Sequence, residues 1–281
     1  MSIKIITDST SDLPESTARQ HGITVIPCYI NIGDKSYLDG VDILRREFYE
    51  NLPTYPILPQ TASPNQQAFE NAYRQAAAEG ATQVISIHVA GAFSSVVDTA
   101  HAAANAVADA LGLRVSVVDS GSVTMGIGFM ALYAARAAAA GRSAAEIVAS
   151  LLERAQRTIL FAGLDTVEYL RRSGRASRLQ ASLSAFLHIF PVLRVHMGDV
   201  QMERIRTHAR AFERLLEMAE ECAPLEELAV MHTNCLEKAE QVHKRLEHLL
   251  PGRSIWVGEA APAIGTHVGP NGLGVVCVRA A

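Results

Sequence analysis

The chain has 281 residues, more than the ~100–200 usual for one domain, so its length favours two domains with a ligand site between them. Apolar residues make up 49% of the chain and charged residues 19%, a balance that excludes an intrinsically disordered protein. The net charge of −4 provides no broad basic field, so neither nucleic acid nor an anionic membrane surface is the expected partner.

The first half alternates strands and helices, as a parallel sheet covered by helices requires. The expected strands are Ile3–Thr7, Ile23–Ile32, Gln83–Val89 and Arg114–Val118. The expected helices follow Asp12, run from Asp42 to Leu52, from Ser63 to Gly80, from Val96 to Leu111 and from Gly126 to Ala140, and open at Ser143. The Gly126–Ala140 stretch is shorter than the ~20 residues needed to cross a bilayer and carries Arg136, so it predicts a buried helix.

Four of these helix starts are predicted from capping residues. Asp12 and Asp42 can each accept backbone N–H bonds as N-caps. The segments Ser63-Pro64-Asn65-Gln66 and Ser143-Ala144-Ala145-Glu146 each fit a capping box. The first of these boxes places Thr61 just outside a helix N-terminus.

After about residue 160 the pattern changes to that of a mixed sheet with helices on one face. The expected strands are Thr158–Gly163, Val192–His196, Val200–Arg206, Leu228–His232, Ser254–Glu259 and Leu273–Val278, and the expected helices are His208–Cys222 and Leu236–Leu250. The four cysteines contain no C-x-x-C pair, and the N-terminus reads directly into a strand without a signal peptide. We therefore expect a cytoplasmic α/β protein without a transmembrane segment.

The loop Gly91–Ser95 follows a predicted strand and opens a helix, where unpaired backbone N–H groups and the helix dipole favour an anion. Ser94 and Ser95 are therefore candidates for holding a carboxylate or a phosphate. The alternative is that one of these serines is only the helix N-cap, which is the commoner role at such a position.

His267 lies in the glycine-dense segment Gly265–Gly274, which predicts a turn before the final strand. Imidazole can donate a hydrogen bond to an anion near neutral pH, so His267 is a second candidate for anion binding. The alternative is a turn that carries an incidental exposed histidine.

Four arginines lie between Leu170 and Arg178, and Arg204, Arg206 and Arg210 follow later. Arginine suits carboxylate or phosphate, although such a run is more often a solvated face. The segment Asp8–Asp12 could bind a metal or a phosphate, but a capped turn is favoured because no further carboxylates cluster with it. The usual nucleotide, zinc-protease and serine-hydrolase motifs are absent from the sequence, so neither a cofactor nor self-sufficient catalysis is expected.

Six segments, in order along the chain, resemble the DegV family. They are Asp8–Pro14, Pro59–Pro64, Asp119-Ser120, Tyr169–Arg175, Pro191–Leu193 and Gly265–Pro270. The resemblance implies an N-terminal three-layer α/β/α domain with a parallel sheet, over residues 1–160, and a C-terminal two-layer α/β domain with a mixed sheet, over residues 161–281. It also implies one fatty acid bound between or within these domains.

The resemblance further implies a function. The family includes the fatty-acid-binding subunit of bacterial fatty acid kinase, which presents its acid to a separate ATP-binding kinase subunit that makes an acyl phosphate. On this pattern Thr61 and Ser94 hold the carboxylate of a long-chain fatty acid, His267 approaches it, and the Ser95 backbone lies nearby. Such a protein binds lipid without catalysis of its own. The resemblance is also compatible with transient contact between the protein and a membrane surface.

Three charged residues match family positions around the site. Arg175 and Arg206 match arginines near the site mouth, and Asp39 matches an acidic position associated with the encounter with the kinase. The chain departs from the family in one loop, where Ser94-Ser95-Val96-Val97 replaces the usual Ser-Gly-Thr-Tyr.

Energetics also support the ligand class that the resemblance implies. Burying about 15 methylenes at ~0.8 kcal/mol each is worth roughly 12 kcal/mol before association costs, which exceeds what one carboxylate contact adds. The alternative function is a subunit acting on a small polar metabolite, because the architecture also resembles the substrate-binding subunit of dihydroxyacetone kinase. A long apolar tunnel favours the carrier, and a small polar cavity around His267 favours the alternative.

Overall fold

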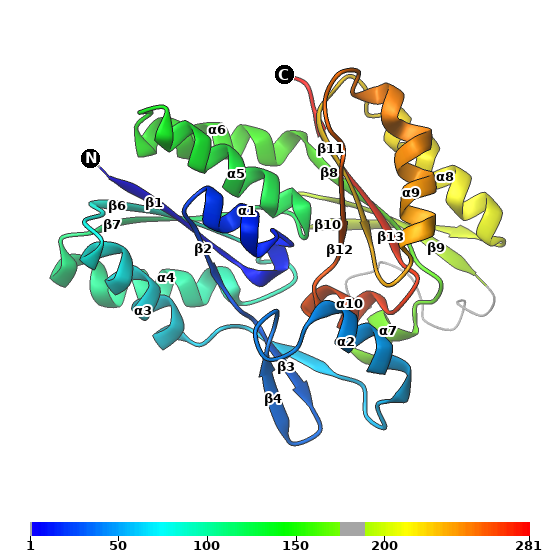
Figure 1. Cartoon of the computed structure of the whole chain (residues 1–281), viewed down its shortest axis with the longest axis horizontal. Coiled ribbons are helices and arrows are strands. Elements are labelled where there is room, and N and C mark those ends of the chain that lie inside the picture. Colours follow the sequence, from blue (N-terminus) through cyan, green and yellow to red (C-terminus); the bar gives the residue numbers. More distant parts are fainter. Residues whose placement is uncertain (1, 175–188) are drawn as a thin grey trace.

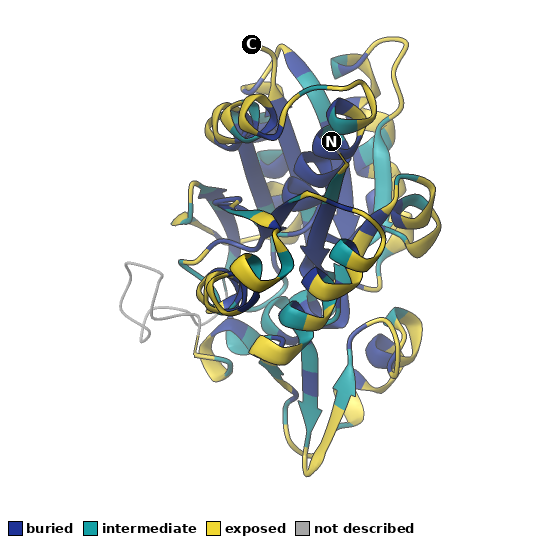
Figure 2. Cartoon of the chain, turned by 90° about the vertical axis from the view of Figure 1, so that its left-hand side faces the viewer, coloured by how far each residue is buried: buried dark blue, intermediate teal, exposed yellow. Residues whose placement is uncertain are grey.

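The computed structural model describes residues 2–174 and 189–281, and it confirms the predicted α/β class. Figure 1 shows two main sheets side by side, with helices between them and on both outer faces. Buried residues concentrate in the strands, and exposed residues follow the outer helix faces (Figure 2). No helix in the described ranges is long and apolar enough to cross a membrane.

The first main sheet is parallel, in the order β2-β1-β6-β7. Its strands are β1 (Ile3–Asp8), β2 (Ile23–Ile26), β6 (Gln83–His88) and β7 (Arg114–Asp119). Helices α3 (Gln66–Ala78) and α4 (Val96–Leu111) cover one face, and α5 (Met125–Ala139) and α6 (Ala144–Arg157) cover the other (Figure 1). The sheet therefore forms the middle of the three α/β/α layers that were expected.

The second main sheet is mixed, in the order β10-β9-β8-β13-β11-β12, with β11 and β12 parallel and the other pairs antiparallel. Its strands are β8 (Thr158–Gly163), β9 (Phe190–His196), β10 (Asp199–Ile205), β11 (Leu225–His232), β12 (Trp256–Glu259) and β13 (Leu273–Arg279). Helices α8 (His208–Glu220) and α9 (Leu236–Leu246) cover its outer face (Figure 1). The division into domains at residue 160 stays a prediction.

The helix layer of α5 and α6 is shared by the two main sheets. Both helices contact strands of the parallel sheet and also β8 and β13 of the mixed sheet. Eleven of the 15 residues of α5 are buried, because one side of the helix faces each sheet. A helix that is apolar all round is stable only in such a buried position, which explains the Ala-rich composition of Gly126–Ala140.

A third, three-stranded sheet lies beside the main sheets and was not predicted as a separate unit. It consists of β3 (Tyr29–Ile32), β4 (Lys35–Leu38) and β5 (Gln60–Ala62), in the order β4-β3-β5, and packs against α2 (Arg45–Asn51). The single strand expected over Ile23–Ile32 is wrong, because the chain leaves the parallel sheet after Ile26. Pro27, which has no backbone N–H to donate, stands at the break.

Three of the four predicted helix caps are wrong, and only the capping box of Ser143 and Glu146 is confirmed. Helix α1 (Glu15–Gln20) has Pro14 at its N-cap, and Asp42 accepts the Leu38 N–H instead of capping α2. The third error concerns α3, whose N-cap is Asn65 and not Ser63. Tertiary contacts occupy the freed side chains of Asp12 and Ser63.

The remaining short elements lie in the connections between the longer helices and strands. They are the 3₁₀ turns η1 (Ser9–Ser11), η2 (Leu52–Thr54) and η5 (Glu247–Leu249) and the helices α7 (Glu168–Arg172) and α10 (Pro262–Val268). Helix α10 replaces the first part of the turn expected over Gly265–Gly274. Pro262 at its first position is preorganised for a helix, and Gly269, at φ +75°, follows its end.

Candidate functional site

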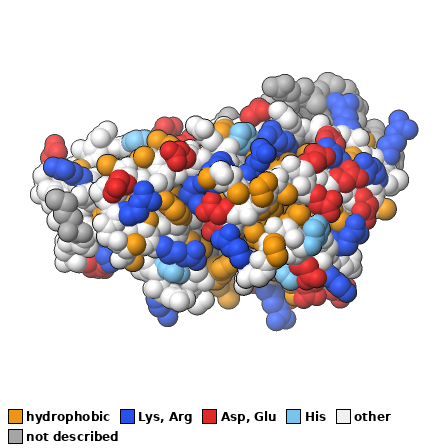
Figure 3. Space-filling view, turned by 90° about the horizontal axis from the view of Figure 1, so that it is seen from above, with side chains coloured by type: hydrophobic (Ala, Val, Ile, Leu, Met, Phe, Trp, Pro, Cys, Tyr) orange, Lys and Arg blue, Asp and Glu red, His pale blue; other side chains and the backbone are white. Residues whose placement is uncertain are grey.

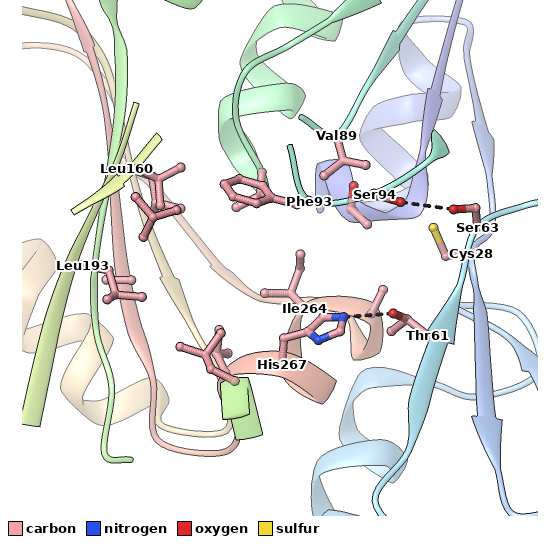
Figure 4. Close-up of a pocket in the computed structure, with 18 of the residues that line it drawn as sticks. Cys28, Thr61, Ser63, Val89, Phe93, Ser94, Leu160, Leu193, Ile264 and His267 are labelled. Carbon is pink, nitrogen blue, oxygen red and sulfur yellow. Dashed lines mark hydrogen bonds between the residues drawn. The ribbon is translucent and has the colours of Figure 1, made fainter. Parts of the chain in front are cut away.

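A cavity of about 440 Å³ lies between the carboxyl ends of the parallel strands and the mixed sheet. Segments that follow β1, β6 and β7 line one side of it, and β8, β9 and β10 line the other. Ligands of open α/β sheets bind at the carboxyl ends of parallel strands, so the position of the cavity fits a binding site. Figure 4 shows the polar residues Thr61, Ser63, Ser94 and His267 toward one end, and Leu160 and Leu193 at the other.

The polar end brings together three segments that are distant in the sequence. Thr61 lies on β5, Ser94 follows β6, and His267 is in the last turn of α10. The Thr61 Oγ1 atom is 2.9 Å from His267 Nε2, and the two side chains point toward each other in Figure 4. All three predicted carboxylate-binding residues therefore line one cavity.

The hydroxyls of Ser94 and Ser95 do not cap helix α4. Ser95 occupies the N-cap position, but no side chain there bonds to the helix backbone. Both hydroxyls instead lie within hydrogen-bonding distance of the Ser63 hydroxyl, at 3.1 Å for Ser94 and 3.0 Å for Ser95. The capping alternative considered for these serines is thus not realised, and their side chains line the cavity.

The backbone of this loop is less available to an anion than the sequence suggested. The N–H groups of Phe93 and Ser94 both bond to the Ala90 carbonyl, at 2.8 and 3.3 Å. The hydroxyls of Ser94 and Ser95 are further donors in this loop, with Ser95 itself exposed at the rim. The predicted place of the Ser95 backbone near the carboxylate stays a prediction.

Ser63 is a site residue that the sequence did not reveal. It was expected to open a capping box, whereas it lies one residue beyond β5, lines the cavity and contacts Ser94. Asparagine is as good an N-cap as serine, and Asn65 accepts the Ala68 N–H in that role at 2.9 Å. Asn65, two residues after Ser63, was the signal in the sequence. Because it can cap α3 itself, it leaves the Ser63 hydroxyl available for the cavity.

The other end of the cavity is apolar and is built mainly by regular strands. Leu160 lies on β8, and Leu193 and Val195 lie on β9. Phe93 and Ile264 add apolar surface between these strands and the polar end (Figure 4). Among the described residues that line the cavity, there is no Asp, Glu, Lys or Arg.

The three charged residues predicted near the site mouth have different placements. Arg175 lies outside the described residues. Arg206 directly follows β10 and is exposed, so its predicted contact role remains open. Asp39 is only 2% exposed, so its carboxylate cannot meet a partner at the surface in this conformation. Its side chain accepts a bond from Ser9 Oγ at 2.8 Å and from the Ala263 N–H at 3.4 Å.

The segment Asp8–Asp12 forms the capped turn that was favoured over a metal or phosphate loop. Asp8 accepts the backbone N–H of Thr10 at 3.0 Å and that of Val89 at 3.2 Å, and it contacts His88 Nδ1 at 3.0 Å. No group of metal-ligating side chains occurs in the described part of the chain.

These features define a class of protein. It is an α/β protein in which two main sheets enclose an apolar cavity that has hydroxyl and imidazole groups at one end. The chain belongs to the DegV family, whose model, described as "Uncharacterised protein, DegV family", matches residues 2–280. One relative, the DegV domain-containing protein SCO2569 of Streptomyces coelicolor, is 35% identical over 280 residues, which cover 98% of this chain and 97% of the relative.

Solved structures confirm the fold. A DegV family protein from Thermus thermophilus, described by its fatty acid binding, has a TM-score of 0.88 and 28% identity, with complete coverage of both chains. DegV from Bacillus subtilis, described as a fatty acid binding protein, has a TM-score of 0.90 and 28% identity, covering 99% of this chain and 100% of that one.

Proposed function

We propose that the protein binds one long-chain fatty acid in the cavity, with the carboxylate at Thr61, Ser94 and His267 and the acyl chain along Leu160 and Leu193. The observation that carries this proposal is the separation of the cavity into a polar and an apolar end. The descriptions of the Thermus thermophilus and Bacillus subtilis proteins as fatty acid binders support the same ligand class.

The polar end is suited to orienting a carboxylate. The Thr61–His267 and Ser63–Ser94 contacts each contain a hydrogen that can turn from its present partner to a carboxylate oxygen. Hydrogen bonds to a charged group contribute about 1.5–3 kcal/mol each. The head group is thereby held at the exposed rim near Ser95, while apolar burial supplies most of the affinity.

A small polar metabolite is the weaker candidate ligand. Beyond its hydroxyls and imidazole, the described lining consists of Val, Leu, Ile, Ala and Phe side chains and the Cys28 thiol. Such a surface gives a polar metabolite few hydrogen-bond partners and leaves its polar groups desolvated.

We further propose that the bound acid is presented to a separate ATP-binding kinase subunit, which converts it to an acyl phosphate. The family resemblance of the sequence supports this step, together with the lack of a nucleotide-binding motif in the chain itself. Ser95 is exposed, so a partner could approach the carboxylate end of the cavity. Acidic and basic side chains are mixed on the face shown in Figure 3, without a field of one sign there. Use of ATP would place this partnership in the cytoplasm.

Organic extraction and mass spectrometry of the purified protein test the ligand. We expect one fatty acid per chain. The proposal fails if no acyl species is extracted and calorimetry detects no binding of palmitate or oleate.

The kinase step has its own assay. The protein incubated alone with ATP, magnesium and fatty acid should produce no acyl phosphate and no ADP. Formation of acyl phosphate by the isolated protein would contradict the role of a non-catalytic carrier.

A further inference from the structure

Helix α10 controls the polar end of the cavity, because it carries His267 and presents Ala263 and Ile264 to the lining. The helix has seven residues, too few to be stable in isolation. Although it lies near the end of the chain, it packs against η1, α2, β3 and β5 from the first quarter and against α7 (Figure 1). Its position must therefore come from these contacts.

Two buried carboxyl groups bind the start of α10. Asp12 Oδ1 accepts the Ala261 N–H at 2.7 Å, and Asp39 Oδ2 accepts the Ala263 N–H at 3.4 Å. Asp12 is 1% exposed and Asp39 is 2% exposed, and Arg45 Nη2 lies 3.7 Å from Asp12 Oδ1. Asp12 adopts a left-handed backbone conformation at φ 57°, which costs energy in a residue other than glycine.

These carboxyl groups stabilise the fold inefficiently. The second oxygen of each, Oδ2 of Asp12 and Oδ1 of Asp39, is buried without a hydrogen-bond partner in the described structure. Leaving a buried polar atom unpaired costs about 1–3 kcal/mol. Burial raises the pKa of Asp12 to about 7 and the pKa of Asp39 to about 6, against the opposing effect of Arg45. An arrangement this costly points to a role beyond stability.

Two tyrosines pack directly on glycines in α10 and just after it. A Cβ atom at Gly265 would lie 2.5 Å from Tyr49 Oη, and a Cβ atom at Gly269 would lie 2.3 Å from Tyr169 Cδ2. Tyr49 Oη also donates to the Ala260 carbonyl at 2.9 Å. The glycines therefore permit close packing of α10, which is a stricter requirement than the turn flexibility suggested by their sequence.

We propose that Asp12, Asp39 and Tyr49 are positioning residues for the head group of the bound acid, because they fix α10 at the distance that places His267 Nε2 beside Thr61. None of the three touches the reacting or bound carboxylate in this assignment; they act through the helix. The inference rests on the proposed fatty-acid site. It assigns Asp39, which was expected at a partner surface, to the interior of the protein.

Asp8 provides a matched control. It is also buried, at 0% exposure, and it also accepts hydrogen bonds from its neighbours. Its hydrogen-bond partners among the described residues, Thr10, His88 and Val89, belong to the first sheet and its loops, and none belongs to α10. Replacing Asp8 should therefore lower stability without moving the imidazole of His267.

The test compares Asp12→Ala, Asp12→Asn, Gly265→Ala and Asp8→Ala. Palmitate affinity is measured by calorimetry well below each melting temperature, and the His267 ring nitrogens are followed by ¹⁵N NMR in ligand-free protein. We expect Asp12→Ala and Gly265→Ala to weaken palmitate binding roughly 10-fold and to shift the His267 signals. Asp12→Asn keeps an oxygen acceptor for the Ala261 N–H and should stay within about threefold of the parent.

The outcomes separate a positioning role from a structural one. If Asp12→Ala and Gly265→Ala only lower the melting temperature, as Asp8→Ala should, and leave affinity and His267 signals unchanged, the inference is wrong. If Asp12→Ala does not fold, Gly265→Ala decides, because it acts on the packing of α10 against Tyr49 and leaves the Asp12 and Asp39 carboxyl groups in place. If the parent binds no palmitate, the proposed function fails, while unchanged or shifted His267 signals still decide whether α10 is positioned as inferred.

Discussion

The two ends of the cavity are built in different ways. Its apolar end comes largely from adjacent regular strands, with Leu160 on β8 and Leu193 on β9 of the same sheet. Its polar end comes from the three-residue strand β5, a loop and a seven-residue helix, which meet only in the folded chain. The strands can provide contact area for many kinds of acyl chain, whereas the short elements set the direction in which that chain lies.

Chain length should have the largest effect on binding. Shortening palmitate to decanoate removes six methylenes, worth up to about 5 kcal/mol at ~0.8 kcal/mol each. Because the shorter chain also loses less conformational freedom on binding, we expect affinity to fall by roughly 100- to 1,000-fold. Calorimetry on delipidated protein measures this, with palmitic methyl ester as the control that alters only the head group. If the ester weakens binding more than the shorter chain does, the polar end contributes more to affinity than the apolar end, contrary to our expectation.

Single changes at the polar end should have an intermediate effect. Thr61→Val and His267→Ala each remove a hydrogen bond to a charged group, so palmitate affinity should fall about 10- to 150-fold. Thr61→Ser keeps the hydroxyl and is the matched control. The melting temperature of ligand-free Thr61→Val should change little, because Thr61 is only partly buried. Affinities within twofold of the parent for both variants would place the carboxylate elsewhere.

The sequence predicted the elements at the apolar end of the cavity much better than those at its polar end. The bounds expected for Thr158–Gly163 and Val96–Leu111 match β8 and α4. The spacing of apolar residues and the glycines and other turn residues that flank them define such elements locally. The position of Ser63 depended on which of two residues capped α3. Helix α10 depended on partners more than 200 residues away, such as Asp12 for Ala261. Local patterns cannot resolve competition of this kind.

Ser94 and Asn65 offer a sharper contrast between binding and capping. Ser94→Ala removes a cavity hydroxyl that does not cap α4, so it should weaken palmitate binding up to about 10-fold with little change in stability. Asn65→Ala removes the observed cap of α3 and should cost about 0.5–2 kcal/mol of stability with affinity unchanged. Chemical denaturation and calorimetry on both variants check this. The opposite pattern, with stability lost in Ser94→Ala, would restore Ser94 as a structural cap.

The smallest expected effect on affinity is that of pH acting through Asp12 and Asp39, because each keeps an oxygen acceptor for the backbone of α10 in either protonation state. Their titration should instead appear in the stability of the fold. Burial raises the pKa of Asp12 to about 7 and that of Asp39 to about 6, above the ~3.9 expected in the unfolded chain. The folded protein therefore binds these protons more tightly than the unfolded chain. Their stabilising contribution is full below about pH 4 and is lost as pH rises toward 7.

Urea denaturation between pH 4 and 9 measures this contribution, and Asp12→Asn, which stays neutral throughout, isolates the share of Asp12. Other titratable groups coupled to this pair also contribute to the parent profile; they are Asp8, Cys28, Arg45 and Tyr49. Their shares largely cancel in the difference between parent and variant. We expect the parent to lose more stability than Asp12→Asn as pH rises from 4 to 7, with parallel curves above pH 8. Parallel curves over the whole range would mean that folding does not raise the pKa of Asp12, and that Arg45 offsets its burial more strongly than the 3.7 Å separation implies.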